Sequence, residues 1–157
     1  MKRLQLYLET SVWNFYFADD APEKQTITCQ FFERVKQTHY DIYVSEVVLT
    51  EIARASEEKM HKLLELIGEC HPKRLALTED VIVLAQRYLH AGILPQRCLE
   101  DAFHAAVATV YEMDALISWN LRHLANLSRM EKINGINLLE GYSKKLELIT
   151  PMEVLYE

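Results

Sequence analysis

Short apolar segments alternate with helical segments along the whole of this 157-residue chain. Five segments are short and apolar enough to be strands: residues 3–8, 41–44, 74–77, 115–118 and 146–149. The stretches between them carry apolar residues at helical spacing, as between residues 23 and 38. Strands that alternate with helices form a parallel sheet covered on both faces. We therefore expect an α/β chain with a three-layer α/β/α fold and a central parallel sheet of four to five strands.

The helical segments carry recognisable start signals. Ser45 and Thr78 are good N-cap residues, and Pro151 suits the first position of a last helical turn. The expected helices cover residues 12–17, 23–38, 46–55, 57–70, 79–91, 96–112, 120–126 and 130–139. Small residues on the segment 96–112, with alanines from Ala102 to Ala108, would let that helix lie close to the sheet.

Length and composition limit the class of protein. A chain of 157 residues is expected to be one domain, spanning 1–157, and can bury about two-thirds of its surface without a disulfide or structural metal. Four Gly and four Pro argue against an all-β or disordered chain. The three cysteines, Cys29, Cys70 and Cys98, fit no disulfide framework, so we expect reduced thiols. The N-terminus reaches an acid too early for a signal peptide, and no apolar run approaches the ~20 residues of a membrane span. A cytoplasmic protein without a membrane partner is expected.

The formal net charge of −6 argues against a general nucleic-acid binder, which is usually basic. Net charge is a weak criterion, however, because a metal site concentrates acids locally and small basic groups can lie beside it. One such group is Arg122 with His123, which makes these residues the best candidates for contacts to a phosphate.

Four separated polar residues stand where strands end or helices begin. Glu9 follows the first strand, and Asn120 follows the fourth. Glu51 lies about two turns into the helix after the second strand, and Asp101 lies early in the helix before the fourth. Ligands of parallel α/β sheets bind at the carboxyl ends of the strands, so these side chains can meet there. Three carboxylates and an amide would suit a hard divalent cation, as metal-assisted phosphodiester hydrolysis requires.

Each of these residues also has a structural interpretation. Glu9 alone is more often a turn or N-cap acid, and Glu51 alone is more often a solvent-facing helix residue. Asp101 could simply favour a helix N-terminus, and Asn120 is most often a helix cap. His104, one turn after Asp101, suits a packed core histidine that is hydrogen-bonded to the backbone better than a catalytic one, and Trp13 and Trp119 suit packing.

The motifs around these residues resemble those of PIN domains. Residues 7–11, Tyr-Leu-Glu-Thr-Ser, are similar to the family's opening motif, usually Asp-Thr-Ser, and residues 44–55 resemble the second motif. Residues 101–108 resemble Asp-Ala-x-His-x-Ala-x-Ala, and residues 118–123 resemble Thr-Trp-Asn-x-x-His. The order, the spacing and the chain length match, so the resemblance covers essentially the full chain.

This resemblance implies a metal-dependent ribonuclease, often the toxin of a VapC-type toxin–antitoxin pair. Glu9, Glu51, Asp101 and Asn120 would then occupy the four acidic positions, as catalytic residues and ligands of Mg²⁺ or Mn²⁺. Thr10 and Ser11 would line the substrate site. The implied partners are an RNA substrate, a small antitoxin with an Arg or Lys among the carboxylates, and a second copy in a homodimer.

The chain departs from the family pattern at two positions. Glu9 is one methylene longer than the usual Asp, and Asn120 keeps an oxygen ligand but removes a negative charge. The lost charge should weaken a second metal more than a first, so we expect one tightly bound metal. Glu9 and Asp101 are then the expected direct ligands, and Glu51 is expected to act through water or as a base.

Other functions stay open from the sequence. The departures at Glu9 and Asn120 also suit a PIN-like binding module that has weakened or lost catalysis. A small-molecule phosphohydrolase would commonly carry Asp-x-Asp after the first strand, where this chain has Glu-Thr-Ser. A dinucleotide-dependent oxidoreductase is remote, because no Gly-x-Gly-x-x-Gly occurs.

Overall fold

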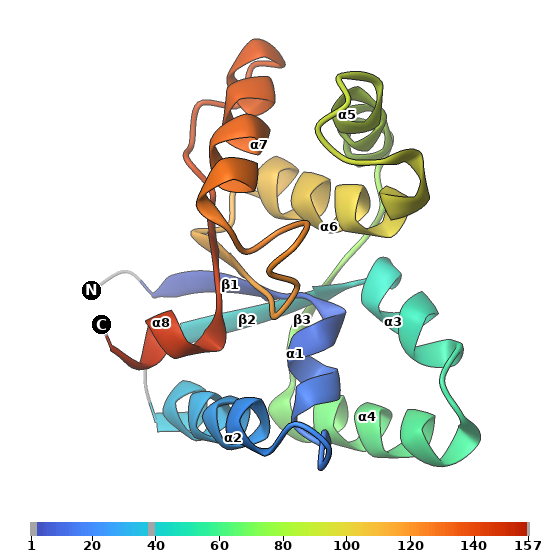
Figure 1. Ribbon diagram of the computed structural model, residues 1–157, viewed down its shortest axis with the longest axis vertical. Coiled ribbons are helices and arrows are strands. Elements are labelled where there is room, and N and C mark those ends of the chain that lie inside the picture. Colours follow the sequence, from blue (N-terminus) through green and yellow to red (C-terminus); the bar gives the residue numbers. More distant parts are fainter. Residues whose placement is uncertain (1–2, 38–39, 157) are drawn as a thin grey trace.

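A computed structural model of the protein describes residues 3–37 and 40–156, and within them five strands form one parallel sheet (Figure 1). The strand order is β3-β2-β1-β4-β5. The strands are β1 (Leu4–Leu8), β2 (Tyr40–Ser45), β3 (Lys73–Leu75), β4 (Ala115–Ile117) and β5 (Glu147–Ile149). The expected three-layer α/β/α fold with a parallel sheet of four to five strands is confirmed, with all five strands present.

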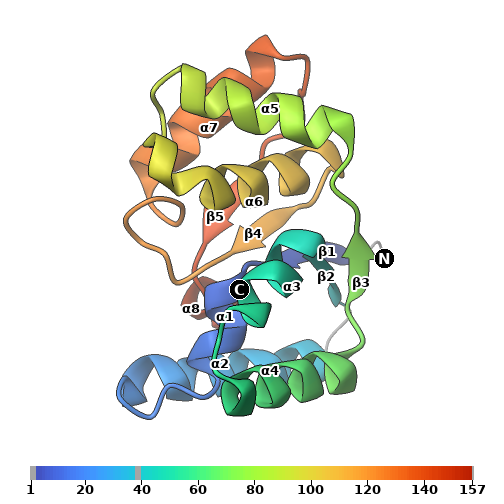
Figure 2. The same cartoon turned by 90° about the vertical axis from the view of Figure 1, so that its right-hand side faces the viewer.

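Helices cover both faces of the sheet (Figure 2). One layer contains α5 (Glu79–His90), α6 (Leu99–Val110) and α7 (Leu127–Leu139). The other contains α1 (Thr10–Phe15), α2 (Pro22–Gln37), α4 (Glu57–Cys70) and α8 (Pro151–Leu155). Helix α3 (Glu46–Ala53) starts directly at the end of β2 and contacts both α1 and α6, so it connects the two layers at the carboxyl edge of the sheet.

The small-residue face of α6 is buried as the sequence predicts. Ala102, Ala105, Ala106 and Ala108 have no exposed surface, and α6 packs against α5 and β4. Alanines let the backbone of a helix approach its neighbours closely, and this approach leaves no room for larger side chains. Packing of α6 therefore fixes the position of the residues at its N-terminus.

Two predicted helices differ from the observed ones. The segment 96–112 is a 3-10 turn (Gln96–Cys98) followed by α6, and residues 120–126 form consecutive turns in place of a short helix. In the second case the side-chain oxygen of Asn120 accepts the backbone N–H of His123, and Asn126 donates to the carbonyls of Leu121 and Arg122. These side chains satisfy backbone groups that a helix would otherwise pair, as Asn commonly does in turns. The predicted end of the second helix, Thr38, lies outside the described residues.

The close packing of α6 can be tested by enlarging one of its alanines. Ala106→Leu should lower the free energy of unfolding by about 1–3 kcal/mol, because the added carbons have no space in a filled interior. Denaturant unfolding followed by circular dichroism measures this change. Ala53→Leu, at an exposed position of α3, is the matched control and should change it by no more than about 0.5 kcal/mol.

Candidate active site

The four polar residues singled out in the sequence all lie at the carboxyl edge of the sheet or on the helix ends that face it. Glu9 directly follows β1, and Asn120 comes three residues after the end of β4. Glu51 lies in the second turn of α3, which begins where β2 ends, and Asp101 lies in the first turn of α6. Because β1 is flanked by β2 and β4, the segments carrying these residues are neighbours in space.

Glu9 is the N-cap of α1 and is almost completely buried, with 5% of its surface exposed. Its backbone N–H donates to the carbonyl of Ile117 at 3.0 Å, which extends the pairing of β1 with β4 by one residue. Its side-chain Oε1 accepts hydrogen bonds from the backbone N–H of Ser11 at 3.0 Å, from the Ser11 hydroxyl and from the Ser118 hydroxyl at 2.9 Å. Glu9 is thus both the N-cap of α1 and a buried acid at the carboxyl end of β1.

Glu51 is held by a buried histidine. The Oε1 atom of Glu51 accepts hydrogen bonds from the Thr10 hydroxyl at 2.7 Å and from Nε2 of His104. The other ring nitrogen of His104, Nδ1, lies 2.7 Å from the Tyr7 hydroxyl, which in turn lies 2.7 Å from the Ser45 hydroxyl. This chain of contacts runs from β2 through β1 and α6 to α3, so it fixes the rotamer of Glu51 relative to the sheet.

Asp101 is contacted by the turn that follows β4. The side-chain amide of Asn120 donates to Asp101 Oδ1 at 3.3 Å, and Nδ1 of His123 lies 3.6 Å from Asp101 Oδ2. The carboxamide oxygen of Asn120 accepts the backbone N–H of His123 at 3.0 Å, so this oxygen already has a partner. In this arrangement Asn120 orients Asp101 through its N–H group.

Ser118 connects these groups to one another. Its hydroxyl donates to Glu9 Oε1 and accepts the backbone N–H of Asn120, both at 2.9 Å. Ser11 makes a parallel link, because its hydroxyl donates to Glu9 and accepts the backbone N–H of Trp119 at 2.8 Å. A continuous hydrogen-bond network therefore joins Glu9 to Asn120 and, through Asn120, to Asp101.

The pKa values of the acids move in opposite directions. Burial raises the pKa of Glu9, opposed by the charge of His104 and by the two serines. Burial also raises the pKa of Asp101, opposed by His104 and His123, and the nearby Glu51 raises it further. Burial would raise the pKa of Glu51 as well, but its hydrogen bond to His104 and the charge of that ring hold it below its ordinary value.

His104 is the cationic partner of this acidic edge. Burial alone would lower the pKa of its ring, but the hydrogen bond to Glu51 and the charges of Glu9, Glu51 and Asp101 raise it. The prediction of a packed core histidine is confirmed by its complete burial, although its partners are side chains and not the backbone. Tyr7 was not predicted as a partner of His104, because it reads as an ordinary strand residue, and Ser45 was predicted only as an N-cap.

The oxygen atoms left over suit a hard cation. All the hydrogen bonds described for Glu9 and Glu51 fall on one oxygen of each carboxylate, Oε1, so each has a second oxygen for another ligand. Within residues 3–37 and 40–156, the three carboxylates do not gather their oxygens within 4.8 Å of one another; Cys98, Asp101 and His123 do bring ligand atoms that close. A cation held by one or two carboxylates and several waters is the usual arrangement for Mg²⁺.

The sequence-predicted substrate residues differ in their surroundings. Thr10 is buried and donates a hydrogen bond to Glu51, and Ser11 donates to Glu9. Both residues therefore orient the carboxylates. His123 is half-buried beside Asp101, whereas Arg122 is exposed on the turn next to it. Arg122 is therefore the one of these four with a charged group directed at solvent beside the site.

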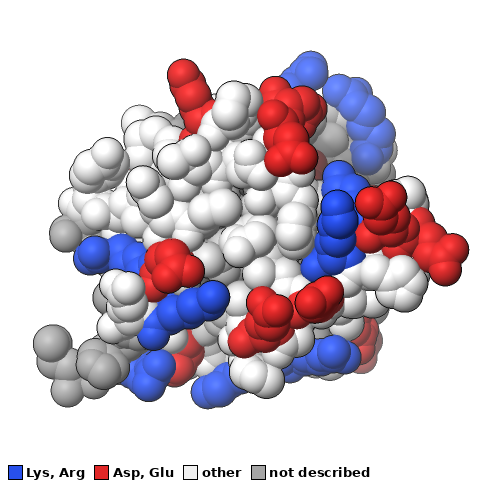
Figure 3. Space-filling model, turned by 90° about the horizontal axis from the view of Figure 1, so that it is seen from below, with Lys and Arg blue, Asp and Glu red and all other residues white. Residues whose placement is uncertain are grey.

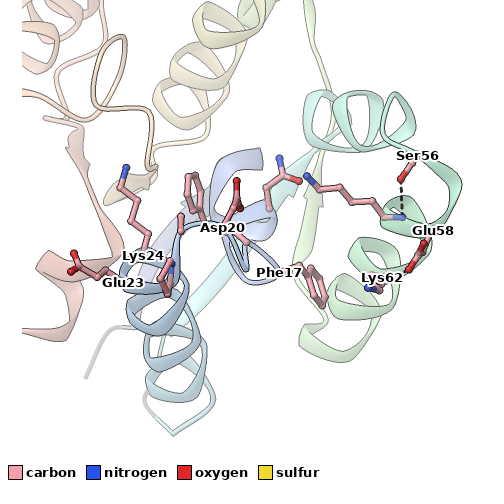
Figure 4. A pocket seen from close by; sticks show the side chains of 13 residues that line it. Phe17, Asp20, Glu23, Lys24, Ser56, Glu58 and Lys62 are labelled. Carbon is pink, nitrogen blue, oxygen red and sulfur yellow. Dashed lines mark hydrogen bonds and ion pairs between the residues drawn. The ribbon is translucent and has the colours of Figure 1, made fainter.

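A groove of about 920 Å³, lined by none of these acids, lies between the end of α1, the start of α2 and the start of α4 (Figure 4). Its charged lining is balanced, with three lysines (Lys24, Lys59 and Lys62) and three acids (Asp20, Glu23 and Glu58). Acidic and basic side chains are also interspersed on the face seen from below in Figure 3. Neither surface has the single positive sign that would attract a nucleic acid.

Comparison with known proteins gives matches among solved structures. No protein-family model matches the sequence, and no curated protein does. A chain of the crystal structure of VapBC2 from Rickettsia felis, bound to a DNA fragment from its promoter, is similar over 92% of this chain and 98% of its own, with a TM-score of 0.55 and 11% sequence identity. The chain has a PIN-like fold. The expectation of a PIN-like fold is thereby confirmed, while the assignment of the motifs stays a prediction.

A second solved structure is VapBC-5 from Mycobacterium tuberculosis, a member of the VapBC family of toxin–antitoxin systems. It covers 93% of this chain and 98% of its own, with a TM-score of 0.49 and 16% sequence identity. The assignment of the PIN-like fold rests on the Rickettsia felis structure.

None of the helices in the described part of the chain is long and apolar enough to cross a membrane.

The His104–Glu51 pair predicts a specific pH dependence of stability. The raised pKa of His104 contributes stability that is complete below its ordinary value of 6.5 and is lost as the pH rises through the folded value. The lowered pKa of Glu51 contributes stability that is complete above 4.5 and is lost as the pH falls through the folded value. Both contributions are complete between these two values. His104→Gln should therefore cost most in this window, roughly 2 kcal/mol, and less at higher pH.

Denaturant unfolding of the wild type and the variant across this pH range measures the difference. His61→Gln is the matched control, because His61 lies on the exposed face of α4 beside Glu57. The free energy of unfolding of this variant should differ little from that of the wild type at every pH. A cost of His104→Gln that stays constant from pH 5 to pH 9 would contradict the charged pair.

Proposed function

We propose that residues 1–157 form a single PIN-like domain that hydrolyses RNA phosphodiester bonds internally with the help of Mg²⁺ or Mn²⁺. The observation that carries this proposal is the arrangement of Glu9 and Glu51. The surrounding donors hold one oxygen of each carboxylate and leave the other for a cation or its water. Groups that orient metal ligands in this way are typical of metal sites in proteins.

The donor set supports the binding of a hard cation. Glu9 and Asp101 are held in a buried or half-buried position where burial raises the pKa of both, and a bound cation would compensate their charge. When bound, Mg²⁺ or Mn²⁺ lowers the pKa of a coordinated water and offsets the negative charge of a phosphodiester. We assign Glu9 and Asp101 as direct ligands of one such ion.

Glu51 and Asn120 are best assigned as orienting residues. The lowered pKa of Glu51 makes it a weak base, so its second oxygen would position a water and not remove its proton. Asn120 uses its oxygen on the backbone of His123 and its N–H group on Asp101, which supports a role in aligning Asp101. Arg122, exposed on the same turn, would contact a phosphate of the RNA.

The likeness to a chain of a VapBC structure supports a toxin role for this protein, with a small antitoxin as its partner. An antitoxin side chain of Arg or Lys placed among Glu9, Glu51 and Asp101 would neutralise the acids and block a cation. A second copy in a homodimer stays a prediction: in the aromatic run Trp13–Phe17, Trp13 is fully buried against Phe32, whereas the other aromatic rings keep part of their surface exposed.

The nuclease proposal predicts metal-dependent cleavage that depends on Asp101. Purified protein incubated with a mixed RNA pool and Mn²⁺ should give defined fragments, and chelation should abolish them. Asp101→Asn should slow cleavage by on the order of 10²-fold or more, because an amide oxygen binds a hard cation far less well than a carboxylate. Quantification of fragments with time measures the rate.

Asp80→Asn is the matched control, since Asp80 also lies in the first turn of a helix, α5, but away from the site. It should cleave at the wild-type rate. Equal cleavage by Asp101→Asn and Asp80→Asn would remove Asp101 from the mechanism.

A binding module without catalysis is the second candidate, favoured by the engagement of the Asn120 oxygen with the backbone of His123. Calorimetric titration with Mn²⁺ separates the two candidates. The nuclease should bind one Mn²⁺ per chain at millimolar concentration or better, and Glu9→Gln should weaken this binding by roughly tenfold or more through loss of a charged ligand. Absence of detectable heat from the wild type would favour the module.

A further inference from the structure

A second cluster of potential metal ligands lies beside the carboxylates. Sγ of Cys98 lies 3.7 Å from Nδ1 and 3.8 Å from Nε2 of His123, and Nδ1 of His123 lies 3.6 Å from Oδ2 of Asp101. The sulfur, nitrogen and oxygen atoms of these three residues all lie within 4.8 Å of one another. The cluster is therefore compact enough for its three side chains to share one ion.

The types of ligand differ from those of the oxygen site. Thiolate and imidazole are ligands that Zn²⁺ and similar transition metals prefer, whereas Mg²⁺ takes oxygen almost exclusively. The spacing is also suitable. Around a tetrahedral Zn²⁺, bond lengths of ~2.3 Å to sulfur and ~2.1 Å to nitrogen place these two ligands roughly 3.6 Å apart, and nitrogen and oxygen ligands roughly 3.3 Å apart. The observed 3.7 Å and 3.6 Å need only small adjustments.

The backbone of each residue is fixed by contacts outside the cluster. The N–H of Cys98 donates to the carbonyl of Pro95 at 2.8 Å, and Asp101 follows one turn later on the closely packed helix α6. The N–H of His123 donates to Asn120. Cys98 is buried, and Asp101 and His123 keep only 17% and 15% of their side chains exposed. The site is thus preorganised, with two ligands that carry negative charge when Cys98 is a thiolate.

We propose that Cys98, Asp101 and His123 bind a divalent transition metal of the Zn²⁺ class, with the fourth position open to water. Asp101 belongs to both sites, so a Zn²⁺ ion here withdraws one carboxylate from the oxygen site. As a consequence that rests on the proposed nuclease function, micromolar Zn²⁺ would act as an inhibitor of cleavage supported by Mg²⁺ or Mn²⁺.

Cobalt(II) is the direct probe for this site, because a thiolate bound to Co²⁺ gives charge-transfer absorption in the near ultraviolet. Titration of the purified, reduced protein with Co²⁺ should produce this absorption with a stoichiometry of one, and added Zn²⁺ should remove it. Cys98→Ser should abolish the band, and His123→Gln should weaken Co²⁺ binding by roughly 10²-fold. Thermal unfolding by circular dichroism verifies that both variants are folded.

Cys70→Ser is the matched control. Cys70 is a half-buried thiol and also lies next to a histidine, His71, but among the described residues it belongs to no group of three potential metal ligands. It should keep the full cobalt band. A wild-type protein without the band, or a band that survives Cys98→Ser and disappears in Cys70→Ser, would overturn the assignment.

The regulatory consequence has its own readout. With RNA and Mn²⁺, Zn²⁺ should inhibit the wild type and Cys70→Ser, while Cys98→Ser should need at least tenfold more Zn²⁺ for half-inhibition. A protein that shows the cobalt band but no RNA cleavage would retain the metal site and contradict only the nuclease function. Cleavage that is equally sensitive to Zn²⁺ in all three proteins would contradict the inhibitory role of Cys98.

Discussion

The side chain of His104 has no exposed surface, and both of its ring nitrogens have partners. It lies on α6, contacts Tyr7 on β1 and holds Glu51 on α3, so it joins a helix from one layer to the sheet and to the helix that connects the layers. An unpaired charge at this depth would be strongly unfavourable, and the acids around the ring supply its compensation. The carboxyl edge of the sheet therefore depends on this ion pair for its geometry and for part of its charge balance.

Around this pair the chain places acids where their mutual repulsion must be offset. Hydroxyls of Thr10, Ser11 and Ser118 and the amide of Asn120 hold one side of the carboxylates, which orients them without neutralising them. Asp101 lies at the border of two ligand sets, one of oxygen and one that adds sulfur and nitrogen from Cys98 and His123. The identity of the metal would then decide which set Asp101 serves, because hard and borderline cations prefer different partners.

Much of the fold could be predicted from the sequence. All five strands, the order of the helices and the caps at Ser45 and Thr78 follow from hydrophobic periodicity and local capping rules. The segment 120–126 was predicted incorrectly as a helix, because the side chains of Asn120 and Asn126 bond to the backbone locally and compete with helical pairing. The break at Cys98 within the segment 96–112 had no signal in its composition.

The sequence by itself determined the alternation of strands and helices. It thereby also placed Glu9 and Asn120 after strands, Asp101 at a helix start and Glu51 in the second turn of the helix that follows β2. These features depend on neighbours along the chain, which a sequence displays directly. Only the tertiary structure decided that Tyr7 and Ser45 support His104, that Ser118 joins Glu9 to Asn120, and that Cys98 meets His123. Such contacts arise from the order of the parallel strands, which brings residues far apart in the chain to one edge of the sheet. No local sequence pattern encodes this order.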